Sequence, residues 1–141
     1  MALAWNDSFS VKITEIDNQH KTLVVMINRL HMAIRTAEAE DIVPKILEEL
    51  LEYVKIHFET EERYLKLAHY PDFDEHKKTH ARLAKRVNDM YNNLTDSEIL
   101  FEDMIELYLF LQEWLNSHLL FDDKLYIPFL KEFHDVENSN V

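Results

Sequence analysis

Two short segments, HFETE at residues 57–61 and HKKTH at residues 76–80, decide the fold of this chain. In each segment, two side chains of metal-binding type stand four residues apart: His57 with Glu61, and His76 with His80. On an α-helix, residues four apart lie on the same face, one turn above each other. Both segments are therefore predicted to be helical, with their imidazole and carboxylate groups on one side.

Apolar residues around these segments and in two further stretches recur with the helical period, so the sequence predicts four helices. The first is expected to end near Ala37, and His69-Tyr70-Pro71 is expected to break the second. A loop is expected at Asn92 and Asn93. Each stretch follows a residue that can cap a helix N-terminus: Asp17, Asp41, Asp72 and Thr95. Thr95 is also paired with Glu98, three residues later, as a capping box.

Helices joined by short loops become antiparallel neighbours, so the predicted fold is all-α: an antiparallel up-down-up-down four-helix bundle with an N-terminal extended arm. We expect a single domain over residues 1–141, divided into an arm (1–16), the bundle (17–119) and a C-terminal segment and tail (120–141). The arm is rich in apolar residues without a helical period, which predicts that it packs on the bundle.

The composition agrees with a helical globular protein. Hydrophobic residues make up 47% of the chain and there is no glycine, which β-rich proteins need in their turns. A net charge of −12 argues against nucleic acid or an anionic membrane as partner. The absence of cysteine excludes disulfides and thiolate metal sites. Neither a signal peptide nor a membrane-spanning stretch is visible, so a cytoplasmic location is expected.

The candidate ligands gather at one end of such a bundle. There, the starts of the first and third helices meet the ends of the second and fourth. Seven residues fall at that end: His20, His57, Glu61, His76, His80, His118 and Asp123. Spacing alone favours Asp122 over Asp123, because Asp122 stands four residues after His118. Asp123 reaches the same face only if the helix ends, bulges or turns after Leu119.

Imidazole and carboxylate groups are ligands that iron and zinc accept. Seven are too many for one ion, but they suit two ions that share bridging carboxylates. Without a metal, each buried group left without a partner would cost about 1–3 kcal/mol. The chain has no Glu-x-x-His pair, which the ferritin-like di-iron plan requires. The other polar candidates are interpreted as structural or solvated: His31, Glu59, Glu62, His69 and His134.

These motifs resemble those of the hemerythrin family, and in particular its stand-alone single-domain bacterial members, the bacteriohemerythrins. The resemblance covers most of the chain, from Trp5 into the C-terminal segment. The matching stretches are the Trp5 arm, DNQH at 17–20, HFETEE at 57–62, Tyr70-Pro71 before HKKTH, and WLNSH at 114–118 before DKLY at 123–126.

The resemblance implies reversible O2 binding at a non-haem di-iron centre, for oxygen storage, transport or delivery. Two iron ions (Fe2+/Fe3+) would share an oxo or hydroxo bridge and two bridging carboxylates, Glu61 and Asp123. One iron would take His76, His80 and His118. The other would take His20 and His57 and keep an open position for O2. Apolar neighbours of the ligands are expected to form a pocket that excludes water: Leu23, Val24, Ile27, Phe58, Trp114 and Leu119.

The sequence favours O2 binding over catalysis, because no side-chain acid or base stands out as placed for substrate chemistry. Three other functions stay open: O2 or redox sensing, a di-iron peroxidase or oxidase, and iron handling. Whether O2 is stored, delivered, scavenged or sensed is also open, as is the identity of any O2-consuming partner protein.

Overall fold

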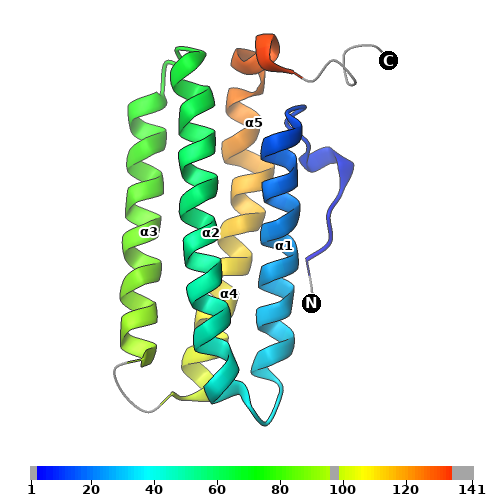
Figure 1. Ribbon diagram of the computed structural model, residues 1–141. Coiled ribbons are helices and arrows are strands. Elements are labelled where there is room, and N and C mark those ends of the chain that lie inside the picture. The colour runs from blue at the N-terminus through cyan, green and yellow to red at the C-terminus, as the bar shows by residue number, and fades with distance from the viewer. Residues whose placement is uncertain (1–2, 96–98, 135–141) are drawn as a thin grey trace.

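The computed structural model describes residues 3–95 and 99–134, without the side chains of residues 95 and 121–123. It is an all-helical bundle with four long helices: α1 (Thr14–Ile34), α2 (Ala39–Leu67), α3 (Phe73–Thr95) and α4 (Phe101–Ser117). The chain runs in alternating directions along successive helices, so the bundle is antiparallel and up-down-up-down (Figure 1). The predicted fold class is confirmed.

The C-terminal segment covers the end of the bundle at which α1 and α3 begin (Figure 1). The chain leaves α4 in a π-helical turn, η2 (His118–Asp122), followed by the short helix α5 (Asp123–Tyr126) and the 3-10 helix η3 (Ile127–Phe133). A π-helix repeats at i→i+5, so backbone positions five apart lie one turn above each other. The irregularity that a ligand role for Asp123 requires after Leu119 is therefore present in the backbone.

Two groups of buried apolar side chains hold the bundle together. The larger lies along its length, where α1 packs on α2 and α4, and α2 packs on α3. The smaller group closes the end that carries the C-terminal segment. It joins side chains of the arm, α1, α2, the turn after α2 and the C-terminal segment: Val11, Ile13, Ile16, Leu65, Tyr70, Tyr126 and Leu130. The candidate ligands lie between these two groups, so both sides shield them from water.

The arm is shorter than predicted, because α1 begins at Thr14 and Asp17 lies inside the helix instead of capping it. The Asp17 carboxylate accepts hydrogen bonds from the Ser10 hydroxyl (2.6 Å) and the Val11 N–H (2.9 Å). These bonds fasten the arm to α1. Tertiary contact has thus redirected a side chain that local preference assigns to an N-cap.

Two other helix boundaries differ from the prediction. The second helix begins at Ala39, ahead of Asp41, and the third continues through Asn92 and Asn93 to Thr95. In both places a buried residue, Ala39 or Leu94, extends the apolar stripe into the core. Packing therefore outweighs the loop preference of asparagine. The fourth helix starts at Phe101, so Thr95 does not cap it, and Glu98 lies outside the described residues.

The second helix ends close to the predicted place. It stops at Leu67, and His69 takes a left-handed conformation (φ 54°) while the Tyr70 N–H bonds back to the Leu65 carbonyl at 3.0 Å. This is a helix-ending geometry that usually employs glycine. The third helix begins directly after Asp72, as predicted.

Within the described part of the chain, no helix combines the length and apolar character that crossing a membrane requires.

Candidate metal centre

Six of the seven predicted ligands have described side chains, and the fold brings all six together. His20 lies in the second turn of α1, His57 and Glu61 lie in the last third of α2, and His76 and His80 lie in the first turns of α3. His118 follows α4 directly. The seventh, Asp123, begins α5, and its side chain lies outside the described residues.

Three imidazoles converge on one oxygen of Glu61. The Nε2 atoms of His20 and His57 are 3.0 Å apart, and those of His57 and His118 are 3.1 Å apart. Glu61 Oε2 lies 3.2 Å from the Nε2 atoms of both His57 and His118 and 3.8 Å from that of His20. All four side chains are almost completely buried.

The other oxygen of Glu61 faces the remaining two histidines. Oε1 lies 2.6 Å from His76 Nε2 and 3.1 Å from His80 Nε2. The donor atoms thus form two groups that could each hold a metal ion, and Glu61 belongs to both. One carboxylate between two sets of imidazoles is the arrangement of a bridging ligand.

A chain of hydrogen bonds decides which nitrogen of His57 carries its proton. The Thr60 hydroxyl donates to the Ile56 carbonyl (3.0 Å), so its oxygen accepts from the Gln19 amide N–H (3.0 Å). The Gln19 carbonyl oxygen then faces His57 Nδ1 at 3.0 Å and can only accept. His57 Nδ1 therefore carries the proton, and Nε2 presents its lone pair to the cluster.

His80 is held in the same way by Glu62. Its Nδ1 lies 2.8 Å from Glu62 Oε2, and a carboxylate can only accept, so Nδ1–H is the donor. In the neutral ring, the lone pair on His80 Nε2 then points at Glu61 Oε1, 3.1 Å away. This corrects the interpretation of Glu62 as part of a solvated acidic face: its side chain is only 21% exposed and orients a candidate ligand.

The electrostatics of the site favour a neutral His57 beside an ionised Glu61. Burial lowers the pKa of His57 to about 3, and the neighbouring His20 adds to this effect. For Glu61, burial works to raise the pKa, but the surrounding imidazoles, His118 foremost, outweigh it and hold the pKa well below its ordinary value. Neutral His57 and charged Glu61 are the protonation states in which both groups bind metal.

This donor set fits metal ions. With both rings neutral, lone pairs on His57 and His80 face the oxygens of Glu61, an arrangement that is repulsive unless a cation lies between them. Imidazole nitrogen with carboxylate oxygen suits iron and zinc. The second ring nitrogens of both histidines are already engaged by Gln19 and Glu62, as is usual for metal-ligating histidine.

Aromatic rings fix two of the ligand histidines. Phe58 stacks on His80 with ring centroids 3.8 Å apart and an interplanar angle of 5°. Trp114 stacks on His118 at 5.3 Å and 26°. The other predicted members of the apolar wall are buried within the core: Leu23, Val24, Ile27 and Leu119.

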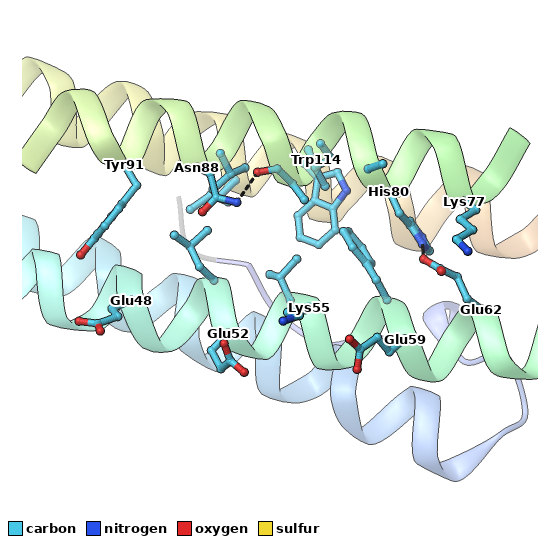
Figure 2. A pocket seen from close by; sticks show the side chains of 18 of the residues that line it. Glu48, Glu52, Lys55, Glu59, Glu62, Lys77, His80, Asn88, Tyr91 and Trp114 are labelled. Atoms are coloured by element: carbon cyan, nitrogen blue, oxygen red, sulfur yellow. Dashed lines mark hydrogen bonds and ion pairs between the residues drawn. The ribbon is translucent and has the colours of Figure 1, made fainter.

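A groove of about 610 Å³ runs between α2 and α3 and reaches this wall. Figure 2 shows His80 and Glu62 at one end of the groove, and Tyr91 and Glu48 at the other. Phe58 and Trp114 are among the side chains that line it. The two aromatic rings therefore lie between the groove and the histidine cluster.

The position of His118 differs from what the family resemblance implies. The resemblance assigns it to the same iron as His76 and His80, whereas its Nε2 groups with His20 and His57. Its ring centroid is 5.3 Å from that of His57 and 6.0 Å from that of His80, so it borders both groups.

The three other histidines lie outside the cluster, as interpreted from the sequence. His31 stacks on Tyr108 at 4.5 Å and 12°. His69 is exposed in the turn after α2, and His134 follows η3.

An antiparallel four-helix bundle with a buried histidine and glutamate cluster at one end defines a metal-binding helical protein. The sequence profile of the Hemerythrin HHE cation binding domain matches residues 11–130. The chain belongs to the hemerythrin family.

Relatives named bacteriohemerythrin are similar over most of their lengths. The protein from Stenotrophomonas maltophilia (strain R551-3) is 32% identical over 129 residues, which cover 92% of this chain and 82% of the relative. The protein from Methylococcus capsulatus is 34% identical over 122 residues, covering 86% and 91%. A crystal structure of wild-type hemerythrin superimposes with a TM-score of 0.79 at 30% identity and covers 92% of this chain and 98% of its own.

Sequence reasoning assigned no role to four polar residues that organise the site: Gln19, Thr60, Glu62 and Tyr126. For Gln19 and Glu62, the sequence contained a signal that could have revealed their role. Gln19 precedes His20 and Glu62 follows Glu61, and a ligating histidine needs a partner for its second nitrogen. Which histidine each of them serves depends on how the helices are rotated against each other.

Proposed function

We propose that this protein binds O2 reversibly at a non-haem di-iron centre. The ligands in this proposal are His20, His57, Glu61, His76, His80, His118 and Asp123, with Glu61 and Asp123 as bridges. The observation that carries it is the position of Glu61. Its two oxygens face separate groups of histidines, so one carboxylate is placed to hold two ions side by side.

In this proposal the two ions are iron, cycling between Fe2+ and Fe3+ with an oxo or hydroxo bridge. Two ferrous ions would supply the electrons that reversible O2 binding requires. The chain supplies orientation and exclusion of water. Gln19 and Glu62 hold the rings of His57 and His80 with Nε2 facing the cluster. Phe58 stacks on His80 and Trp114 stacks on His118, and both aromatic rings line the groove.

The surroundings of the cluster favour binding over turnover. Its walls are largely aliphatic and aromatic, and the two groups of buried apolar side chains close over it. Such walls keep water away from the ions, which slows irreversible oxidation. The names of the bacteriohemerythrin relatives support the same assignment.

The test is spectroscopic and uses the iron-loaded protein. Reduced under argon, it should contain about two irons per chain and take up about one O2 per iron pair. A visible charge-transfer absorption should appear on exposure to O2 and disappear when O2 is swept away. Sustained consumption of O2 or peroxide with an added reductant would instead place the protein among the enzymes. One iron at saturation would overturn the dinuclear proposal.

A further inference from the structure

His57 and His80, one on each side of the candidate centre, have different hydrogen-bond partners for their second ring nitrogen. His57 Nδ1–H donates to the amide oxygen of Gln19 at 3.0 Å. His80 Nδ1–H donates to the carboxylate of Glu62 at 2.8 Å. The rings play the same role, but one acceptor is a neutral amide and the other carries a full negative charge.

This difference changes how strongly each ring donates to a metal. A charged acceptor draws the Nδ1 proton more strongly than a neutral one. The electron density at Nε2 rises accordingly, and the ring becomes a more basic ligand. His80 is therefore the stronger electron donor, and His57 is the weaker.

Tyr126 adds to the difference in the same direction. Its hydroxyl donates to Glu61 Oε2 at 3.1 Å, and both side chains are fully buried. Oε2 is the oxygen that faces His20, His57 and His118. The hydrogen bond withdraws negative charge from that oxygen, so the His57 side loses donor strength in the carboxylate as well as in the imidazole.

We infer that the two iron positions are electronically unequal: Glu62 stabilises Fe3+ on the His80 side, and Gln19 with Tyr126 leaves Fe2+ favoured on the His57 side. This inference rests on the proposed di-iron centre. With two ferrous ions bound, the first electron would come from the position that His80 holds, and the second from the position that His57 holds. Each electron passes to a one-electron redox dye, and no covalent bond in the chain forms or breaks.

The experiment compares Glu62→Gln with Glu59→Gln. Glutamine at position 62 still accepts the bond from His80 but has no charge. Position 59 is an exposed glutamate three residues away, labelled with Glu62 on the groove in Figure 2. Glu59→Gln therefore removes the same charge from the same helix without touching His80. Both variants and the parent protein are loaded with iron and titrated under argon with redox dyes, while absorbance and the electron paramagnetic resonance signal of the half-oxidised form are recorded.

In Glu62→Gln the first oxidation should become harder, so the two one-electron potentials move closer together. The equilibrium constant for forming the half-oxidised state from the fully reduced and fully oxidised states should fall about five- to tenfold. This is the effect expected when a charged hydrogen-bond acceptor is replaced by a neutral one. Tenfold corresponds to about 59 mV for one-electron steps. Glu59→Gln should change the constant less than about twofold, because an exposed charge is screened. Gln19→Glu should also lower it, by making His57 the stronger donor.

An unchanged constant in Glu62→Gln, with two irons bound, would show that Glu62 only positions the ring and would overturn the inference. An equal change of this constant in Glu59→Gln would also overturn the inference. The effect would then come from the loss of any negative charge on α2, and not from the hydrogen bond to His80. Loss of iron from Glu62→Gln alone would also count against it, since that role is retention and not redox tuning. If the parent protein does not hold two irons or bind O2, the proposed function is wrong. Iron analysis and the O2 spectrum of the parent protein separate that result from a failure of the present inference.

Discussion

Tyr126 and Glu61 form a buried hydrogen bond between the C-terminal segment and the histidine cluster. The hydroxyl donates to Oε2 at 3.1 Å, and neither side chain is exposed to solvent. The bond ties the segment that covers the cluster to the carboxylate that lies between its two histidine groups. The covering of the site and its central ligand are therefore one structural unit.

Replacing Tyr126 by phenylalanine should destabilise the iron-free protein by about 1.5–3 kcal/mol, the usual worth of a hydrogen bond to a charged group. Urea unfolding measures this change. Tyr64→Phe is the matched control, because the Tyr64 hydroxyl donates to Glu15 at 2.8 Å on the exposed surface. That bond competes with water and should matter little. Equal losses in the two variants would contradict the structural role given to Tyr126.

The stability of the iron-free protein should fall as the pH falls from about 6.5. The pKa of His57 is lowered from its ordinary value of 6.5 to about 3 by burial, so between these values the unfolded chain binds a proton that the folded protein does not. Unfolding is therefore favoured by acid in this window, at up to about 1.4 kcal/mol per pH unit for this group.

Urea unfolding between pH 5 and 8 tests this dependence. His57→Gln should flatten the slope, while His69→Gln, an exposed histidine in a turn, should not. Glu61 acts in the same direction at lower pH: its pKa is depressed, so its contribution is present above about 4.5 and is lost below that value. An identical slope in the parent and His57→Gln would show that His57 titrates normally.

Removing iron should lower the melting temperature. A metal that binds only the folded state adds roughly 4 kcal/mol when its concentration is 1,000 times the dissociation constant. The comparison is made by thermal unfolding with and without chelator, followed by re-addition of iron. His31→Gln should keep the iron-dependent shift, because His31 stacks on Tyr108 outside the cluster. His118→Gln should lose most of it. Equal melting temperatures with and without iron would exclude a structural contribution from the metal.

The two proposed bridges should be indispensable to both irons. We expect Glu61→Ala and Asp123→Ala each to empty the centre, since a bridge holds two ions at once. Asp122→Ala should retain about two irons per chain, because the π-helical turn brings position 123 one turn from His118. Iron analysis of the purified variants gives the answer. If Asp122→Ala empties the centre and Asp123→Ala does not, the bridge is assigned one residue too late.

The i, i+4 pairs in α2 and α3 could be read from the sequence, because helical spacing is a local property. The irregular turn after α4 was expected only from the family resemblance, since spacing alone favours Asp122. The ends of the helices were predicted less well. Asp17 suits an N-cap by local preference, but in the fold it binds Ser10 and Val11 instead. Asn92 and Asn93 suit a loop, but Leu94 has a place in the core and keeps them helical.

The sequence by itself determined that four amphipathic helices carry histidines and a carboxylate to one end of an antiparallel bundle, since periodicity and short loops suffice for that. Only the tertiary structure decided which groups touch. Gln19 meets His57 across 38 positions, Glu62 meets His80 across 18, and Tyr126 meets Glu61 across 65. A hydrogen bond needs its two atoms within about 3 Å. The rotation and axial shift of packed helices set that distance, and no local pattern in the chain encodes them.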